Sequence, residues 1–528
     1  MDKDDLELKG FKISSAGAVL MESANLEVLD KLLNKKGCGL CLAKWNQVTL
    51  HLGTGMMHSC HHPKTHKIPL EELKDNPAAL FNTKHIKEVR KQMLNGEKPS
   101  ECDYCWRIEE NGDTSDRLYK SLEPWALPSY DRVVASTGDE DVFPSYLEVD
   151  FSNACNMKCV YCGPEYSSKW VSDLKQKGPL KLLEGTPDES WAQGWQDLDS
   201  LSYKQSEENP YVTAFWEWFP EAYTHLKEYR ITGGEPLMSK ETFRSIDWLI
   251  ANPNPELQFN MNSNLCVPDK IWDKFVDKLQ ILKSNNTIKK VTIYVSAESW
   301  GDAAEYARTD MDFELFKARA EQLAAIGNVR VVVMAAFNVL AITTFKTLLE
   351  WILELKKKHN PNAIVNNDET KTGYKMPGTD FKERAEKNPS LVDSYTIGID
   401  IPYVRHPTHL DVQYCSDDLV EDYLLPALDF MSNNVSWPAY NGHQGFEAHE
   451  VEKLKRIVYN RIYFNPKNKP RNDDKNIKQN RAMFYDFVEA LDARRQTNFL
   501  NVFPEMKEFY DICKNEKSQI NEKYNLGE

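Results

Sequence analysis

The sequence has no excess of positive charge and no long apolar run, and both absences exclude classes of protein. Lys and Arg number 65 against 80 Asp and Glu, so the net charge is −15 and we expect no nucleic-acid partner held by phosphate neutralisation. The longest apolar run, near 331–342, is interrupted by Asn338 and is too short to cross a bilayer, so we expect no membrane partner. The first ten residues, MDKDDLELKG, lack the apolar segment of a secretory signal, which predicts a cytoplasmic protein.

Cysteine, by contrast, is abundant, and its number needs an explanation. Eleven cysteines occur, eight of them before residue 163. Disulfides are rare in reducing compartments, and an odd count leaves at least one thiol unpaired. Metal-binding or catalytic thiolates are therefore the leading interpretation, whereas the scattered Cys266, Cys415 and Cys513 are interpreted as core thiols.

One short loop, SNACNMKCVYC, carries Cys155, Cys159 and Cys162 directly after the alternating residues 146–151, which predict a strand. Three thiolates held this closely suit three irons of a cubane cluster and leave the fourth iron open, while a closed zinc site needs a fourth ligand nearby. The alternatives are a zinc loop or three buried thiols.

A second motif follows the next predicted strand, Tyr229–Thr232. It begins 71 residues beyond the third cysteine of the loop and reads Gly233-Gly234-Glu235-Pro236. Two glycines allow the backbone to approach a ligand closely, and Glu235 supplies an acceptor suited to an ammonium group. A Gly-Gly-Glu-Pro turn by itself is a weak signal, because turns are rich in Gly and Pro. At the end of the strand that follows three clustered cysteines, it is a strong signal for a ligand site.

With these two motifs the sequence resembles the radical S-adenosylmethionine superfamily. The resemblance implies that the three cysteines ligate a 4Fe-4S cluster whose open iron binds the methionine end of S-adenosylmethionine. It implies that the aromatic residue before the third cysteine, Tyr161, belongs to the cofactor site, and that the turn Gly233–Pro236 contacts the methionine amino group.

The resemblance extends to the predicted strand Lys290–Ser296. It implies a ribose-contacting serine at the end of that strand, Ser296, and a carboxylate-binding arginine twelve residues later, Arg308. From the residues alone, Ser296 could equally cap a helix and Arg308 could be a solvated surface charge.

The earlier cysteines also have an ordered spacing. Thirteen residues separate Cys41 from Gly55, four separate Gly55 from Cys60, and Cys102 and Cys105 form a later Cys-x2-Cys pair. Two plus two thiolates suit a tetrahedral or a cubane centre. The pattern resembles the SPASM module, or its shorter form twitch, of radical S-adenosylmethionine enzymes, which implies one auxiliary 4Fe-4S cluster, here before the barrel rather than after it.

Cys38 is an alternative to Cys41 in this centre, because the two residues themselves form a Cys-x2-Cys pair. The spacing to Gly55 favours Cys41. A competing interpretation is a structural zinc site, with Cys60 or His61 outside it, formed by Cys38, Cys41, Cys102 and Cys105.

Strands and helices are predicted to alternate, which indicates an α/β fold with parallel strands. Further strands are expected at 258–264, 329–334 and 395–400, and a helix at Asn82–Leu94. The expected architecture is a partial (β/α)6 TIM-like barrel of the radical S-adenosylmethionine type. Its expected divisions are the SPASM/twitch-like auxiliary module at 31–125, the barrel at 143–420 with a Trp-rich insertion at about 164–228, and a helical C-terminal extension at 421–528.

The resemblance implies an enzyme, a radical S-adenosylmethionine oxidoreductase that abstracts hydrogen from its substrate through a 5′-deoxyadenosyl radical. The first expectation for the substrate is a peptide or protein side chain that is oxidatively modified, with flavodoxin or ferredoxin as electron donor. The alternatives are a dehydrogenase or epimerase of a small molecule or sugar, and a zinc-stabilised binding protein without turnover. No residue pattern identifies a catalytic acid or base.

Overall fold

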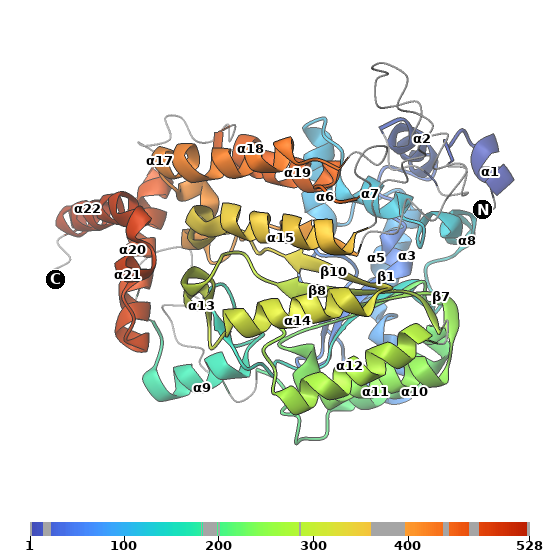
Figure 1. Cartoon of the computed structure of the whole chain (residues 1–528). Coiled ribbons are helices and arrows are strands. Elements are labelled where there is room, and N and C mark those ends of the chain that lie inside the picture. The colour runs from blue at the N-terminus through green and yellow to red at the C-terminus, as the bar shows by residue number, and fades with distance from the viewer. Residues whose placement is uncertain are drawn as a thin grey trace, which may run out of the picture.

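A computed structural model of the 528-residue chain describes residues 3–13, 19, 23–180, 182, 198, 201–284, 287–360, 396–436, 443–463 and 475–524. Its centre is a sheet of nine strands in the order β11-β10-β8-β7-β6-β4-β1-β2-β3 (Figure 1). Neighbours from β11 to β1 are parallel, whereas β2 and β3 are antiparallel to their neighbours. The strands of this sheet are β1 (Gln47–His51), β2 (Met56–His58), β3 (His66–Lys67), β4 (Tyr146–Asp150), β6 (Glu228–Thr232), β7 (Asn254–Ser263), β8 (Ile288–Ser296), β10 (Val329–Met334) and β11 (Ile397–Asp400).

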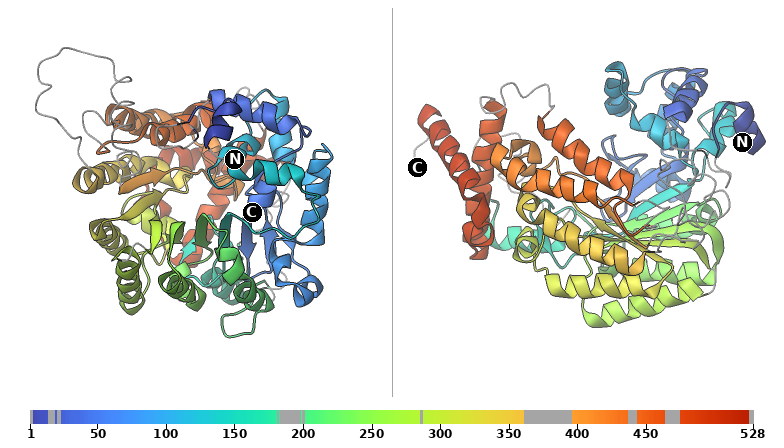
Figure 2. Two further views of the ribbon diagram at one scale, coloured as in Figure 1. Left: turned by 90° about the vertical axis from the view of Figure 1, so that its right-hand side faces the viewer. Right: turned by 45° about the horizontal axis from the view of Figure 1, so that its top comes forward.

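Helices connect the parallel strands and form an outer layer around the sheet (Figures 1 and 2). Before β1 lie α1 (Lys3–Leu8), α2 (Ser23–Asn34) and α3 (Ala43–Asn46). Between β3 and β4 lie α4 (Leu70–Asp75), α5 (Lys84–Leu94), α6 (Asp103–Glu110), α7 (Asp116–Leu122) and α8 (Tyr130–Ala135). Between β4 and β11 lie α9 (Ser168–Lys177), α10 (Pro210–Tyr223), α11 (Lys240–Ala251), α12 (Asp269–Ser284), α13 (Asp302–Ala307), α14 (Phe313–Ile326) and α15 (Phe345–His359). The helices after β11 are α17 (Asp417–Leu419), α18 (Leu425–Asn433), α19 (Ala448–Arg456), α20 (Lys475–Arg495), α21 (Phe499–Val502) and α22 (Lys507–Tyr524).

The predicted α/β fold with parallel strands is confirmed. All six predicted strands are present, as β4, β6, β7, β8, β10 and β11, because each carries a run of buried aliphatic or aromatic residues that the sequence shows directly. The predicted helix at 82–94 is also present as α5, which begins two residues later because the Thr83 side chain accepts a hydrogen bond from the Ile86 N–H and caps it. Strands β11 and β3 are the two ends of the sheet.

Strand β1 was not predicted, and it changes the relation between the first cysteines and the rest of the chain. It pairs in parallel with β4 over its whole length, with His51 opposite Asp150. The expected module 31–125 therefore contributes strands to the sheet that contains the expected barrel strands. The sequence of β1 alternates polar and apolar residues, which suits an exposed edge, yet Gln47 and Thr49 are buried.

None of the helices in the described ranges combines the length and the hydropathy needed to cross a membrane.

Candidate functional site

The first site is a cavity of about 170 Å³ at the carboxyl ends of β6, β7, β8 and β10. Parallel strands bring their carboxyl ends to one side of a sheet, so loops distant in sequence meet there. All ten residues predicted for the cofactor and its cluster line this cavity: Cys155, Cys159, Tyr161, Cys162, Gly233, Gly234, Glu235, Pro236, Ser296 and Arg308. The lining also contains residues that were not assigned from sequence, among them Met157, Tyr166, Asn262, Ser263, Asn264 and Met334.

The loop of three cysteines is held by a small second sheet. Its residues Lys158–Cys159 form β5, which pairs antiparallel with β9 (Arg308–Thr309), and Cys159 lies opposite Arg308. The Val160 N–H donates to the Ala307 carbonyl at 2.9 Å, and the Cys162 N–H donates to the Cys159 carbonyl at 3.1 Å. The backbone, rather than the thiols, therefore fixes the loop.

The two glycines of the turn allow close packing against that loop. Gly233 has a φ of +116°, and a Cβ there would lie 2.4 Å from Asp150 Oδ1. At Gly234 a Cβ would lie 2.4 Å from the Ala154 carbonyl oxygen. The Glu235 N–H donates to this carbonyl at 2.7 Å. These glycines thus bring the turn against residues that lead into the cysteine loop.

Glu235 is buried and already accepts hydrogen bonds within the chain. Its carboxylate receives the Ser263 hydroxyl at 2.9 Å, the Asn264 N–H at 2.7 Å and the Leu237 N–H at 3.1 Å. Burial raises the pKa of Glu235 to about 7 against the opposing effect of these donors. Glu235 therefore fixes the end of β7, and Asn264 in turn donates to Asn156 of the cysteine loop at 2.9 Å.

Arg308 is buried, with 5% of its surface exposed, so the interpretation as a surface charge is wrong. Its Nε and Nη2 donate to Glu298 Oε2 at 3.0 and 2.7 Å, and the Tyr161 hydroxyl donates to the same oxygen at 3.1 Å. Its Nη1 lies 3.7 Å from Cys159 Sγ. Burial lowers the pKa of Arg308, but the Glu298 carboxylate outweighs burial and raises it overall. Glu298 was not predicted, because it belongs to no sequence motif.

Ser296 ends β8 opposite Met334 of β10 and lines the cavity. It does not cap the next helix, α13, whose N-cap residue is Gly301.

The pKa of Cys159 is lowered by a hydrogen bond with the Cys162 thiol and by the Arg308 charge, which together oppose burial. The same hydrogen bond and burial raise the pKa of Cys162, and burial raises the pKa of Cys155 to about 12, so among the three cysteines a thiolate is favoured at Cys159.

Four of the five N-terminal cysteines line a second, smaller cavity. Its lining contains Cys41, Cys60, Cys102 and Cys105, together with Lys44, His62, Asp116 and Arg117. Cys38 is exposed and lines a different surface hollow beside α2. Of the two alternatives, the geometry brings Cys41 to the other three cysteines.

A buried cation and two backbone N–H groups face the four cysteines, but burial opposes ionisation of three of the thiols. Lys44, only 2% exposed, has its Nζ 2.5 Å from Glu101 Oε1, and burial lowers its pKa less than Cys102 and Glu101 raise it. The backbone N–H groups of His62 and Arg117 donate to Cys60 and Cys105. Burial raises the pKa of Cys60, Cys102 and Cys105 to about 12, so these thiols need a bound metal to lose their protons at neutral pH.

Within the described ranges, no three Cys, His, Asp or Glu side chains are arranged to hold a single metal ion. A cubane cluster has another requirement, because each thiolate binds a different iron. The donor set of four sulfurs, a buried cation and backbone N–H groups fits such a cluster.

A chain of polar contacts leads from Cys60 of the second site to Asp150, which lies beside Gly233 of the first. His58 Nδ1 faces the Cys60 carbonyl, and His58 Nε2 lies 3.1 Å from His51 Nε2. His51 Nδ1 in turn lies 3.5 Å from Asp150 Oδ2, whose other oxygen faces Gly233. Burial, followed by the neighbouring His51, lowers the pKa of His58 to about 4. Strand pairing creates this connection, so sequence spacing could not reveal it.

One face of the sheet is polar across β4, β6, β7 and β8. The Arg230 guanidinium lies 4.5 Å from the centre of the Tyr294 ring and donates to Asn262 Oδ1 at 2.9 Å. Glu148 accepts from Thr232 Oγ1 at 3.3 Å and lies 3.8 Å from Arg230 Nε. These four strands therefore carry a network of polar side chains that contact one another, and Asn262 connects it to the cavity lining.

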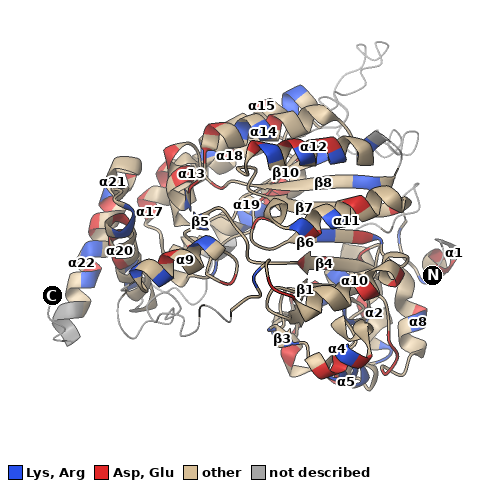
Figure 3. Ribbon diagram, turned by 90° about the horizontal axis from the view of Figure 1, so that it is seen from below, with Lys and Arg blue, Asp and Glu red and all other residues tan. Residues whose placement is uncertain are grey.

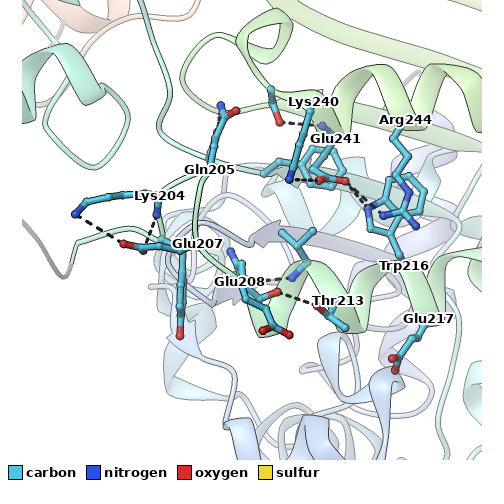
Figure 4. Close-up of a pocket in the computed structure, with 16 residues that line it drawn as sticks. Lys204, Gln205, Glu207, Glu208, Thr213, Trp216, Glu217, Lys240, Glu241 and Arg244 are labelled. Carbon is cyan, nitrogen blue, oxygen red and sulfur yellow. Dashed lines mark hydrogen bonds and ion pairs between the residues drawn. The ribbon is translucent and has the colours of Figure 1, made fainter.

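The described part of the Trp-rich insertion forms a separate hollow of about 460 Å³ (Figure 4). There the Trp216 Nε1–H donates to Glu241 at 2.7 Å, and Arg244 lies 4.0 Å from the centre of the Trp216 ring. The hollow contains none of the predicted site residues. Trp218 is buried in the core, whereas Trp191 and Trp195 lie outside the described residues.

No protein-family model matches the chain, and no curated protein matches it. Among solved structures, the chain is similar to the crystal structure of Streptococcus suis SuiB bound to precursor peptide SuiA. The two are 11% identical over 68% of this chain and 72% of that chain, with a TM-score of 0.27. The function has to be inferred from the residues of the two sites.

Proposed function

We propose that this chain is a radical S-adenosylmethionine enzyme with one auxiliary 4Fe-4S cluster, and that it oxidatively modifies a peptide or protein side chain. The observation that carries the proposal is the convergence of ten residues, chosen from sequence motifs alone, on one cavity at the carboxyl ends of four parallel strands. The ten residues come from four separate segments of the chain, which lie between Cys155 and Arg308.

In this proposal Cys155, Cys159 and Cys162 hold the cluster that binds the cofactor. When bound there, the cluster and S-adenosylmethionine supply one-electron cleavage of the sulfonium and a 5′-deoxyadenosyl radical. The chain contributes orientation: β5 and β9 fix the cysteine loop, and the Glu235 hydrogen bonds fix the end of β7. The cavity walls limit water at the site.

The polar face of the sheet is proposed to bind the substrate. Arg230, Asn262, Tyr294 and Glu148 supply donors and acceptors that suit the amides and side chains of a peptide. The four N-terminal cysteines are proposed to hold the auxiliary cluster, which would take the electron left on the substrate when hydrogen abstraction leads to net oxidation. Flavodoxin or ferredoxin is the proposed electron donor for the first cluster.

Metal analysis of the anaerobically purified and reconstituted full chain tests the proposal. We expect about eight iron and eight sulfide per chain, which is two 4Fe-4S clusters. The triple variant Cys155→Ala, Cys159→Ala, Cys162→Ala should retain about four iron and form no 5′-deoxyadenosine with dithionite and S-adenosylmethionine. The matched control Cys38→Ala should retain all the iron.

Three outcomes would contradict the proposal. Zinc without sulfide would favour a zinc-stabilised binding protein, and wild-type protein that carries iron but forms no 5′-deoxyadenosine with any tested peptide would contradict the radical reaction. Product that equals substrate in mass but differs in stereochemistry would favour an epimerase over an oxidising enzyme.

A further inference from the structure

The carboxyl end of α20, more than three hundred residues after the cysteine loop, lies against that loop. Arg495 Nη2 donates to the Lys158 carbonyl at 2.9 Å across 337 positions of sequence, and Arg495 Nη1 donates to the Tyr306 carbonyl at 3.1 Å. Figure 3 shows α20 near α9, and near the carboxyl end of α20 Arg494 Nη1 lies 2.8 Å from Asp173 Oδ2 of α9. The C-terminal extension thus reaches the proposed cofactor site.

Both carbonyls belong to the segments that form the small second sheet. Lys158 is the first residue of β5, and Tyr306 immediately precedes the end of α13, which leads into β9. Arg495 therefore ties together the two segments that hold Cys159 opposite Arg308. The Tyr306 hydroxyl donates a hydrogen bond to Asp492 of α20 at 3.1 Å. Two residues of α20, Asp492 and Arg495, therefore bind the segment around Tyr306.

Trp170 of α9 completes the arrangement. Its Nε1–H donates to the Cys159 carbonyl at 2.9 Å, and its ring centre lies 5.7 Å from the Arg495 guanidinium. A fully buried Trp at this place leaves Arg495 little freedom to swing toward water.

Arg495 differs from Arg308 and Arg494 in its hydrogen-bond partners. Arg308 is paired with Glu298, and Arg494 is paired with Asp173. In the described part of the chain, the hydrogen-bond acceptors of Arg495 are neutral backbone carbonyls. Asp173 and Asp310 also act on the Arg495 charge through space, but neither is hydrogen-bonded to it, and the charge acts on Cys159 as well.

We propose that Arg495 is a positioning residue for the cysteine loop and that its charge raises the reduction potential of the cluster held by Cys155, Cys159 and Cys162. This inference rests on the proposed function. One electron from the external reductant makes the cluster more negative, so a fixed cation close to it stabilises the reduced form. The C-terminal extension then serves to set how easily the enzyme is reduced.

A matched pair of variants separates charge from packing. Arg495→Lys keeps the charge and Arg495→Gln removes it, while each retains a donor for one carbonyl. The neighbouring control is Arg494→Gln, which loosens α20 from α9 but removes a charge that Asp173 already neutralises. The readout is a redox titration of the reconstituted full chain, followed by electron paramagnetic resonance, with S-adenosylmethionine used to identify the cluster that responds to it.

At a fixed potential we expect about a tenfold lower ratio of reduced to oxidised cluster in Arg495→Gln, which corresponds to about 59 mV for a one-electron couple. Arg495→Lys and Arg494→Gln should stay close to wild type. Equal shifts in Arg495→Lys and Arg495→Gln, a shift in Arg494→Gln as large as in Arg495→Gln, or no shift in any variant would overturn the proposal. Wild-type protein without a cluster that responds to S-adenosylmethionine would instead overturn the proposed function itself.

Discussion

Arg308 is joined to Glu298 by two hydrogen bonds, with Nη2 2.7 Å from Oε2, and Glu298 is fully buried. This edge of the guanidinium is therefore occupied by a carboxylate of the chain itself. The contact with the carboxylate of S-adenosylmethionine that the resemblance implies would fall to Nη1, which lies beside Cys159 Sγ. Glu298 thus limits how Arg308 can serve the site.

Replacing Glu298 by Gln should raise the reduction potential of the first cluster, the opposite direction to Arg495→Gln, because Arg308 then keeps its full charge beside Cys159. Breaking a buried pair should also cost about 3–5 kcal/mol of unfolding free energy. Redox titration and urea unfolding measure the two effects. The control Tyr161→Phe removes one hydrogen bond to the same oxygen but no charge, so an equal potential shift in that variant would contradict the electrostatic explanation.

Replacing Gly233 by Ala should separate the turn from the cysteine loop. The added methyl group would lie 2.4 Å from Asp150 Oδ1, and overpacking of this kind costs about 1–3 kcal/mol beyond backbone strain. Gly112→Ala is a matched control, because Gly112 also has a positive φ, +84°, but no atom within 4 Å of the new Cβ. Thermal unfolding and iron content should both fall further in Gly233→Ala. Equal losses of thermal stability and iron in the two variants would contradict the steric explanation, because backbone strain alone would then account for both.

Replacing Lys44 by Met should empty the second cysteine site while sparing the first. The variant loses the buried cation that faces the cysteines and leaves Glu101 with His85 alone as its ionisable partner. Iron should fall from about eight to about four atoms per chain. Lys98→Met, at an exposed lysine paired with Glu110, should retain all the iron. Full iron in Lys44→Met would show that this cation is dispensable for the centre.

The carboxyl group of Glu228 should make stability depend on pH. Burial, followed by the Glu123 carboxylate, raises its pKa to about 7, so the folded chain keeps this proton to a higher pH than the unfolded chain does. Its contribution to stability is therefore present below about pH 4.5 and is lost as the pH rises through about 7, by about 3 kcal/mol.

Urea unfolding at pH 5 and pH 8 tests this expectation. The free energy of unfolding of wild type relative to Glu228→Gln should be lower at pH 8 than at pH 5, because the variant has no proton to lose. Parallel pH profiles for the two proteins would show that Glu228 titrates normally.

The sequence predicted those parts of the fold and the sites that depend on local pattern. Six parallel strands have their own apolar runs, and the cysteine loop and the turn Gly233–Pro236 are contiguous motifs. What the sequence could not predict depends on pairing between distant residues. Arg495 meets Lys158 across 337 positions, and Glu298 is an acid in a loop whose burial only the fold decides.

The pairing of β1 with β4 also affects the order in which parts of the fold can form during translation. His51 emerges 99 residues before its strand partner Asp150, so the edge of β1 stays open during that interval. All four cysteines of the second site precede β4 in the chain and have therefore been synthesised before the sheet can close over them. Domains fold from the N-terminus as translation proceeds. The four cysteines of the second site can thus come together before the cysteine loop of the first site has been made.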